Sequence, residues 1–256
     1  PPALKSDDVE NSRGYIRLMF YNCENFFDTK DDTLINDENF LPEGDNHWTW
    51  DKHQEKLMHI CRVITGIGGW EPPEIVGLCE VENLYVLEAL TKYSPLSKHN
   101  YQIIHKDSPD NRGIDVAFLY IKKKFTLISW TTFKITYPYN PNRKTRDILY
   151  VCGETGKKDT LHIFVNHWPS RWGGQLESED NRVFVASVVK SKADSIFKTN
   201  PLANIIIMGD LNDYPENKSL IEALKANTNY DNIKTNELYN LSYHLQEKGY
   251  GSNKYN

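Results

Sequence analysis

Hydrophobic positions along the chain repeat with two periods, one typical of strands and the other of helices. Ile205–Met208 is a short continuous apolar run, which is typical of a strand buried on both faces. Lys52–Ile67 instead repeats apolar side chains every three or four positions, which predicts an amphipathic helix with Asp51 as its N-cap. Glu177–Phe197 has the same spacing and predicts a second, longer helix.

These patterns predict a further series of strands and helices. The further strands are Tyr15–Tyr21, Glu74–Cys79, Tyr101–His105, Val116–Ile121, Phe125–Ser129, Phe133–Ile135, Asp147–Cys152 and Leu161–Val165. The further helices are Asn83–Tyr93 and Lys218–Ala226, and Asp28–Trp50 is expected to form a polar surface loop. Strands and helices alternate at both ends of the chain, with adjacent short strands between them, which favours two packed sheets with helices on their outer faces. No repeat or change of composition divides residues 1–256, so we expect a single domain.

Composition and charge narrow the classes of partner. The 256 residues are 39% hydrophobic and 25% charged, as in soluble globular proteins. The formal net charge of −5 gives no overall attraction to nucleic acid, so any phosphate binding must come from local Arg and Lys. No apolar run is long enough to cross a membrane. We also expect the protein to be a monomer.

The cysteines leave the cellular compartment open. Cys23, Cys61, Cys79 and Cys152 lie far apart, without the spacing of a metal site, and nothing selects a disulfide pairing. Cys61 and Cys79 lie in apolar segments and are expected to be buried. The chain begins at Pro1 without Met, so a removed leader with a secreted or periplasmic location fits, and so does a cytoplasmic one.

Polar side chains follow several of the predicted strands. Asp210 and Asn212 come just after the strand that Gly209 ends, and Glu80 follows another buried strand. Asn22 and Glu24 follow the first strand. Each set also fits a simple turn, because Asn and Asp favour turns and an edge carboxylate can face water. In a two-sheet sandwich, however, these strand ends can converge on one edge.

Carboxylates at such an edge suit a hard divalent cation. An acid that directly follows a buried run is costly unless it is solvated or binds a cation. Mg²⁺ and Mn²⁺ bind through one or two carboxylates and keep several waters. Glu80 is therefore the first candidate for a metal ligand.

The segment LHIFVNHWPSRWGG contains a second group of candidates. It places His167, Ser170 and Arg171 on one loop that glycines follow. A single His is more often structural, but His exchanges protons near neutral pH and Arg offers a planar fork to phosphate oxygens. The set is typical of a loop that meets a phosphate.

Five short motifs together resemble a known family. In order they are FYNCENFFD at Phe20–Asp28, GLCEVEN at Gly77–Asn83, NRGIDVAFLY at Asn111–Tyr120, NHWPSR at Asn166–Arg171 and GDLND at Gly209–Asp213. Their wording and order resemble the endonuclease/exonuclease/phosphatase superfamily, and most closely a bacterial subgroup with NxENxFD and HWPSRxGG. The resemblance implies a DNase I-like fold, a four-layered α/β/β/α sandwich, and a metal-dependent hydrolase of phosphate esters.

The resemblance also implies a role for each matching residue. Glu80 matches the principal ligand of a Mg²⁺ or Mn²⁺ ion, and Glu24 a second acid of that site. The remaining implied roles are an amide that holds the catalytic assembly (Asn22), a residue that orients or deprotonates water (Asp210), an amide on the phosphoryl oxygen (Asn212) and a His on the scissile phosphate (His167). We add as our own hypotheses that Asp115 supports that His, with a structural strand residue as the equal alternative, and that Arg171, Arg112 and Ser170 bind substrate phosphate.

One family feature has no match in the sequence. Family members close with a strand and an Asp-His motif, whereas Gly249–Asn256 reads GYGSNKYN and His244 stands in a different context. We expect a chain cut short of its native C-terminus; the alternative is an incomplete catalytic set.

The predicted function is phosphodiester hydrolysis of the nuclease type by in-line attack of water, and several substrates stay open. Nucleic acid would need a basic face, for which Lys122–Lys124 and Arg143–Arg146 are candidates, although a solvated charge cluster is the commoner interpretation. A phosphatase or sphingomyelinase acting on a small or lipid phosphoester needs no such face. A non-catalytic binding protein on the same fold is the alternative from another class.

Overall fold

The computed structural model describes residues 15–69, 71–171 and 174–251. The chain forms two compact units that alternate along the sequence. The first unit comprises Pro1–Ile135, Lys144–His167 and Ile206–Asp210, and the second comprises Thr136–Arg143, Trp168–Ile205 and Leu211–Asn256. The single domain stays a prediction. The expectations of a removed leader and of a missing C-terminal Asp-His motif concern residues 1–14 and 252–256, which lie outside the described residues.

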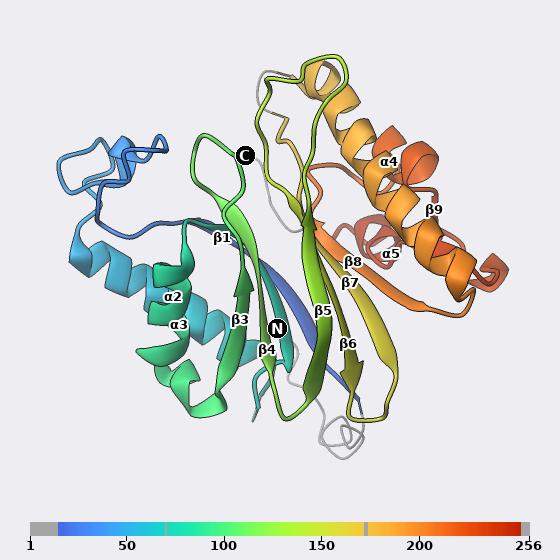
Figure 1. Cartoon of the computed structure of the whole chain (residues 1–256), viewed down its shortest axis with the longest axis horizontal. Coiled ribbons are helices and arrows are strands. Elements are labelled where there is room, and N and C mark those ends of the chain that lie inside the picture. Colours follow the sequence, from blue (N-terminus) through green and yellow to red (C-terminus); the bar gives the residue numbers. More distant parts are fainter. Residues whose placement is uncertain (1–14, 70, 172–173, 252–256) are drawn as a thin grey trace. The chain divides into compact units, whose positions relative to one another are not determined.

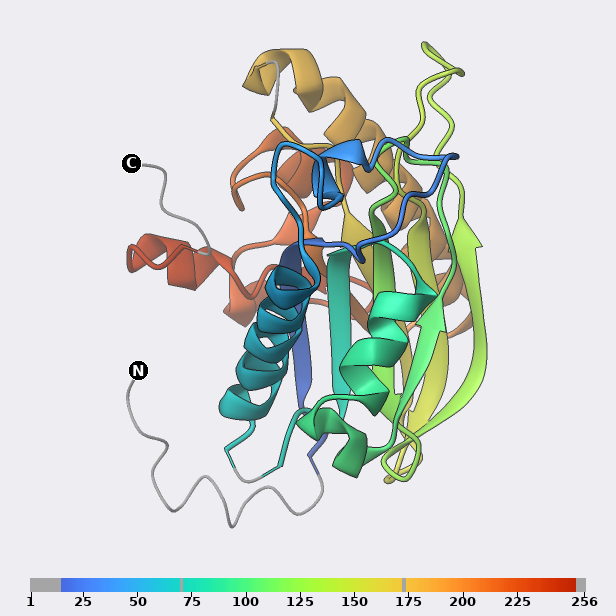
Figure 2. The ribbon, with the colours of Figure 1, turned by 90° about the vertical axis from the view of Figure 1, so that its left-hand side faces the viewer.

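The first unit contains a four-stranded sheet in the order β1-β2-β4-β3. The strands are β1 (Leu18–Phe26), β2 (Ile75–Val81), β3 (Tyr101–His105) and β4 (Asp115–Ile121). β1 and β2 run parallel, so their carboxyl ends meet at the same edge of the sheet, whereas β4 runs antiparallel to both of its neighbours. α2 (Trp50–Ile67) and α3 (Leu84–Lys92) lie on the outer face of this sheet (Figures 1 and 2).

A second four-stranded sheet has the order β5-β6-β7-β8. Its strands are β5 (Phe125–Phe133), β6 (Ile148–Thr155), β7 (Thr160–His167) and β8 (Asn204–Asp210). β5–β6 and β6–β7 are antiparallel pairs. The short turn between Thr155 and Thr160 suits the antiparallel pairing of β6 and β7.

Two hydrophobic cores hold the layers of the first unit together. β2 contributes alternate residues to each core, with Val76 and Leu78 facing the helices and Ile75 and Cys79 facing the second sheet. This period of two follows from the pleat, which points successive side chains to opposite faces. The first unit therefore shows three layers, helix on sheet on sheet.

The second unit contains the long helix α4 (Gln175–Thr199), which the sequence predicted at Glu177–Phe197. Its other elements are the two-stranded sheet of β9 (Ala226–Asn227) and β10 (Leu238–Tyr239), and α5 (Tyr243–Glu247). Among the described residues, no helix has both the length and the apolar character to cross a membrane.

The structure corrects several local predictions. The N-cap of α2 is Thr49, whose side chain accepts from Lys52 N, because Asp51 already lies inside the first turn. Phe133–Ile135 is no separate strand, since β5 runs continuously to Phe133. The helix predicted at Lys218–Ala226 is instead one π-helical turn at Ser219–Ala223.

Two further corrections concern burial. The strand predicted at Ile205–Met208 exists within β8, but its residues are only half-buried because β8 lies at the end of the strand order. The predicted polar loop Asp28–Trp50 is partly interior, since Asp28 and Asp37 are buried. The prediction for the cysteines is confirmed, and all four are buried and free.

Candidate active site

The carboxyl ends of β1 and β2 are irregular where the site begins. The parallel register ends at the pair Asn22–Cys79 and shifts before Phe26 and Val81. Glu80 lies in this shift with a positive φ of 57°, a left-handed conformation that is uncommon for a residue with a side chain. Bulges of this kind redirect a side chain and concentrate at functional sites.

An asparagine joins two carboxylates at this edge. Nδ2 of Asn22 donates to Oε1 of Glu80 at 3.1 Å and to Oδ2 of Asp210 at 3.0 Å. The second oxygen of Glu80 accepts from the backbone N–H of Asn25 at 3.0 Å. The amide thus holds side chains from β1, β2 and β8 together, as expected for residues that follow strand ends.

His167 completes this cluster at the end of β7. Its Nε2 lies 3.6 Å from Oε1 of Glu80, and its side chain is only 3% exposed. Burial, followed by the positive charges of Arg146 and Arg112, holds the pKa of His167 well below its ordinary value of 6.5. The imidazole is therefore neutral at neutral pH, and it can donate a hydrogen bond without carrying charge.

The positive charge near His167 comes from Arg112 and Arg146, which both form an ion pair with Asp110. Nη1 of the buried Arg146 lies 2.9 Å from Oδ2 of Asp110, and Nε donates to the carbonyl oxygen of His167 at 3.2 Å. Nε of Arg112 lies 3.4 Å from Oδ1 of Asp110, and the Arg112 side chain is half exposed. The predicted role of Arg112 in binding substrate phosphate stays a prediction.

Arg146 is the site residue that the sequence did not single out. It appeared only as the end of the basic run Arg143–Arg146, which was interpreted as a solvated charge cluster. That interpretation is wrong for Arg146, which is buried, while Arg143 is exposed. The available signal was its position two residues before β6, where the chain enters the interior.

Glu24 is not brought into the cluster. Its carboxylate is 87% exposed and lies 3.9 Å from Nζ of Lys56. Only its backbone N–H reaches the cluster, where it donates to Oδ1 of Asn22. Glu24 has a left-handed backbone with φ 55°, which turns the chain between Asn22 and the end of β1. The structure thus gives no support to the expected second metal ligand.

Asp115 has a different partner from the one expected. Its Oδ2 lies 3.5 Å from Nε2 of His105, and its Oδ1 accepts from the backbone N–H of Ser108 at 2.9 Å. Within the described residues it makes no hydrogen bond or ion pair with His167, whose Nδ1 is buried without a hydrogen-bond partner. The hypothesis that Asp115 supports His167 is therefore corrected, because the antiparallel pairing of β3 and β4 delivers His105 to it instead.

The GDLND motif depends on a close backbone approach at Gly209. A Cβ at this position would lie 2.3 Å from the carbonyl oxygen of Asn166. Asn166 is fully buried, and its Nδ2 donates to the carbonyl oxygen of Met208 at 3.2 Å. The polar residue before His167 thus ties β7 to β8 instead of serving the site directly.

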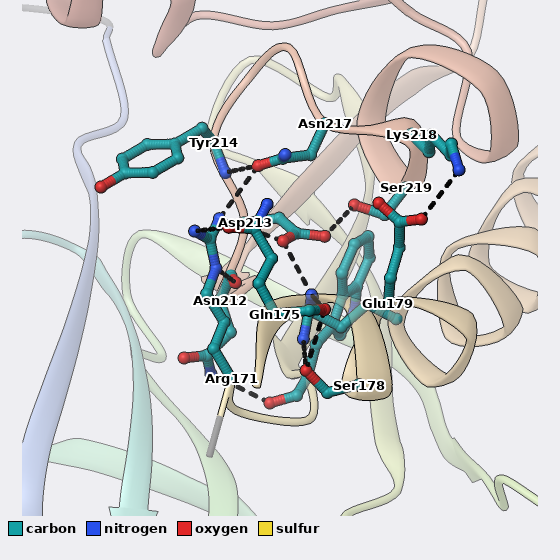
Figure 3. A network of polar contacts seen from close by, with 12 residues as sticks. Arg171, Gln175, Ser178, Glu179, Asn212, Asp213, Tyr214, Asn217, Lys218 and Ser219 are labelled. Atoms are coloured by element: carbon teal, nitrogen blue, oxygen red, sulfur yellow. Dashed lines mark hydrogen bonds and ion pairs between the residues drawn. The ribbon is translucent and has the colours of Figure 1, made fainter. Parts of the chain in front are cut away.

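In the second unit, Arg171 is bonded to the loop that follows β8 (Figure 3). Its Nε donates to the carbonyl oxygen of Asn212 at 2.8 Å, and Nη2 donates to Asp213 at 3.1 Å and to Asn217 at 2.9 Å. Nη1 donates to Gln175 at 3.2 Å. The guanidinium also lies 4.6 Å from the ring centroid of Tyr214.

These contacts change the expected role of Arg171. The structure favours a guanidinium that positions Asn212 over one that binds substrate phosphate, because its nitrogens are already engaged within the loop. Asn212 itself has a left-handed backbone with φ 52°, and its Nδ2 donates to the carbonyl oxygen of Trp168 at 3.0 Å. Ser170 is half-buried and its hydroxyl makes no hydrogen bond among the described residues, so its predicted phosphate contact stays a prediction.

Asp213 anchors the same loop to α4. Nε of the fully buried Arg182 lies 2.8 Å from its Oδ1, and the hydroxyl of Ser219 donates to its Oδ2 at 2.6 Å. Asp213 is thus shared by two arginines, and such a buried charge is tolerated only when it is fully paired. The network fixes the turn that carries Asn212.

The cluster in the first unit has the composition of a magnesium or manganese site. Glu80 and Asp210 offer carboxylate oxygens within reach of one amide, and the Glu80 side chain is 17% exposed. Each oxygen of Glu80 accepts one hydrogen bond, which leaves lone pairs for a cation. Oxygen donors in this number suit a hard divalent ion, so the residues fit the cofactor that the resemblance implies.

Comparison with known families and structures gives a consistent answer. The model of the Endonuclease/Exonuclease/phosphatase family matches residues 17–256 of the chain. Among curated proteins, none matches the sequence.

Solved structures of this type resemble the chain at low sequence identity. The human Nocturnin catalytic domain with bound sulfate is 20% identical, with a TM-score of 0.53 over 80% of this chain and 67% of that chain. An endonuclease/exonuclease/phosphatase family protein from Bacteroides thetaiotaomicron is 16% identical, with a TM-score of 0.55 over 82% and 67%. ANGEL2, a 2′,3′-cyclic phosphatase, is 14% identical, with a TM-score of 0.52 over 75% and 52%. At these identities the likeness shows the fold, and the predicted DNase I-like fold is confirmed.

Proposed function

Because the chain belongs to the endonuclease/exonuclease/phosphatase family, we propose that it hydrolyses phosphodiesters with Mg²⁺ or Mn²⁺ as its cofactor. Membership confirms the prediction of an enzyme that acts on phosphate ester bonds. The metal dependence, the diester and the residue roles are the content of the proposal.

The observation that supports the proposal is the bridge from Asn22 to Glu80 and Asp210, with His167 beside Glu80. Four polar side chains from four strands meet at one place in the first unit, although three of them are separated by more than 50 residues. Two carboxylates that accept from one amide repel each other when both are charged, and a bound cation would offset that repulsion.

We assign each residue the step that its position allows. Asp210, held by the Asn22 amide, accepts the proton of the attacking water. His167 is neutral and donates a hydrogen bond to a non-bridging phosphoryl oxygen, and Arg112 supplies positive charge to the same group. For Asn212, the resemblance implies an amide that donates to the phosphoryl group. The catalytic contribution of the chain is mostly positioning and fixed dipoles, as in other phosphoryl transfers.

Glu80 would hold the divalent ion, with Asp210 as the other carboxylate near it. When bound, this ion stabilises the negative charge that develops on the leaving and non-bridging oxygens. Asn22 keeps the two carboxylates apart and oriented by donating to both.

The proposed substrate is a diester with an accessible phosphate. The overall charge of −5 opposes nucleic acid at long range, so exposed cations near the site, such as the half-exposed Arg112, have to supply the attraction. Since ANGEL2 is a 2′,3′-cyclic phosphatase, a cyclic nucleotide phosphate belongs among the test substrates.

The test measures hydrolysis of bis-p-nitrophenyl phosphate, plasmid DNA, an abasic-site duplex, a 2′,3′-cyclic nucleotide and sphingomyelin, with Mg²⁺ or Mn²⁺ and with EDTA. We expect metal-dependent turnover of at least one diester. Glu80→Gln is expected to lower kcat at least about 10³-fold, since one electrostatic donor alone is often worth 10²–10³-fold.

The matched control is Glu88→Gln, which removes an exposed carboxylate on α3 that pairs with Lys92. It should leave both kcat and KM unchanged. Activity of Glu80→Gln at saturating metal equal to that of the control would overturn the metal assignment, and a wild-type protein that binds Mn²⁺ but turns over none of the substrates would favour the binding-protein alternative.

A further inference from the structure

A second set of metal-ligating side chains lies beside the candidate active site. His105 ends β3, Asp115 begins β4, and Asp107 lies on the connection between them. One ligand atom from each of the three lies within 4.8 Å of the others. None of the three has a role in the hydrolysis proposed above.

The register of the sheet explains why the side chains meet. His105 pairs with Ala117 across the antiparallel ladder, and Asp115 precedes Ala117 by two residues. Residues two apart point to the same face of a sheet, so His105 and Asp115 are diagonal neighbours. Asp115 also pairs with Val81, the residue after Glu80, which places the set near the same edge as Glu80.

The buried half of the set has polar atoms without hydrogen-bond partners. The His105 side chain is only 3% exposed, and its Nε2 makes no hydrogen bond although it points at Asp115. The hydroxyl of Ser108, in the same connection, is also buried without a partner. Buried polar groups are almost always satisfied by protein, water or an ion, so an unsatisfied imidazole nitrogen that faces a carboxylate fits a bound ion.

The distance between the two buried groups suits a shared metal ion. Nε2 of His105 and Oδ2 of Asp115 are 3.5 Å apart. Two ligands of one tetrahedral zinc lie roughly 3.3–3.4 Å apart, given metal–ligand bonds of about 2.0–2.1 Å. The other oxygen of Asp115 accepts from Ser108 N at 2.9 Å, which is the kind of second contact that orients a ligating carboxylate.

We propose that His105, Asp107 and Asp115 bind a transition-metal ion, with Zn²⁺ as the best fit, at a site separate from that of Glu80. An imidazole ligand favours Zn²⁺ over Mg²⁺, whereas the oxygen donors around Glu80 favour Mg²⁺. His105 and Asp115 are the buried anchors. Asp107 is 83% exposed and offers a ligand atom within 4.8 Å of those of the other two residues, so it can complete the site from the solvent side.

The test is calorimetric titration of Zn²⁺ into metal-free protein in the Glu80→Gln background, with excess Mg²⁺ present. Because this background has lost the proposed catalytic ligand, the outcome does not depend on hydrolysis. We expect one Zn²⁺ equivalent that disappears on adding Asp115→Asn or His105→Phe, and that binds about tenfold more weakly on adding Asp107→Asn. Long-range ¹H–¹⁵N spectra should show Zn²⁺ shifting the ring nitrogen of His105.

The matched control is His59→Phe. Nε2 of His59 lies 3.8 Å from Oε1 of Glu55, a similar pair on the exposed face of α2, and its loss should leave the titration unchanged. Asp115→Asn keeps the shape of the side chain, and Asp107→Asn is a surface change, so a folded variant is available even if His105→Phe unfolds. A titration without heat, or one that is the same with and without these three residues, would show an ordinary histidine–carboxylate pair and overturn the proposal.

Discussion

At the scale of single residues, the most unusual environment is that of His167. The ring is almost completely buried, has a carboxylate on one side, and lies in the positive field of Arg146 and Arg112. Burial and positive charge both oppose protonation, so they act in the same direction on the pKa. The result is a histidine suited to hydrogen bonding and unsuited to act as a charged acid.

We therefore expect His167 to remain neutral from pH 8 down to below its ordinary pKa of 6.5. NMR titration of the ring in EDTA should show no protonation of His167 at pH 6.5, the ordinary pKa of histidine. Arg112→Gln removes one of the positive charges and should raise the pKa of His167, while Lys123→Gln, on an exposed turn, should not. A His167 signal that titrates at or above pH 6.5 would contradict the assigned neutral role.

At the scale of elements, the loop after β8 shows how a turn with an unusual backbone is held. Asn212 has a positive φ, and such a conformation persists only when neighbours determine it. Arg171 binds its carbonyl oxygen, and Asp213 connects Arg171 to the buried Arg182 of α4 (Figure 3). The loop after β8, Arg171 and Arg182 of α4 are thus connected by one network of hydrogen bonds and ion pairs.

This network predicts the effect of Arg171→Ala on kinetics. Loss of the guanidinium frees the Asn212 carbonyl, so the amide loses its position and kcat should fall about 10–100-fold with KM changed less than about threefold. Lys218→Ala is the matched control, because it removes an exposed cation of the same loop that pairs with Glu179 at 2.9 Å. A raised KM with unchanged kcat would instead return Arg171 to direct phosphate binding.

At the scale of the whole molecule, buried acids make stability depend on pH. Glu82 is 4% exposed, and burial, followed by repulsion from Asp28 and Asp37, raises its pKa to about 8 from the usual 4.5. The backbone N–H of Asp28 donates to Oε2 of Glu82 at 2.6 Å, which opposes the shift without cancelling it. A carboxyl whose folded pKa is raised binds its proton more tightly in the folded state, so its contribution to stability is lost as pH rises from about 4.5 to about 8.

Glu82→Gln should consequently stabilise the protein at pH 8.5 by roughly 1–3 kcal/mol and have little effect at pH 5. The amide replaces the neutral acid, and its oxygen can still accept from Asp28. Urea unfolding at the two pH values measures the difference, with Glu88→Gln on the surface of α3 as the control. Equal shifts for both variants at both pH values would show that Glu82 is ionised without cost.

Much of the candidate site was predictable, because its residues stand at strand ends that the apolar pattern marks. Asn22, Glu80, His167 and Asp210 each follow an apolar run, and the structure brings these four together. Glu24 shares the same sequence signal, and its backbone is left-handed like that of Glu80, but its side chain turns to solvent. Sequence position alone does not distinguish these cases, because the bulge depends on the neighbouring strand.

The assignments of partners were less predictable. The sequence offered Asp115 and His167 as a pair and Arg171 as a free cation, whereas the structure pairs Asp115 with His105 and engages Arg171 within its own loop. Arg146 appeared as surface charge and is buried beside His167. Each of these outcomes depends on contacts between residues far apart in the chain.

The sequence by itself determined the DNase I-like class, the positions of most strands and helices, and the four polar residues at strand ends. These follow from local periodicity and from short motifs, which one stretch of chain contains in full. Only the tertiary structure decided the N-cap of α2, the half-buried state of β8, the partner of each charged side chain and the lowered pKa of His167. Burial and long-range pairing set these properties, because the cost of an unpaired charge depends on everything packed around it.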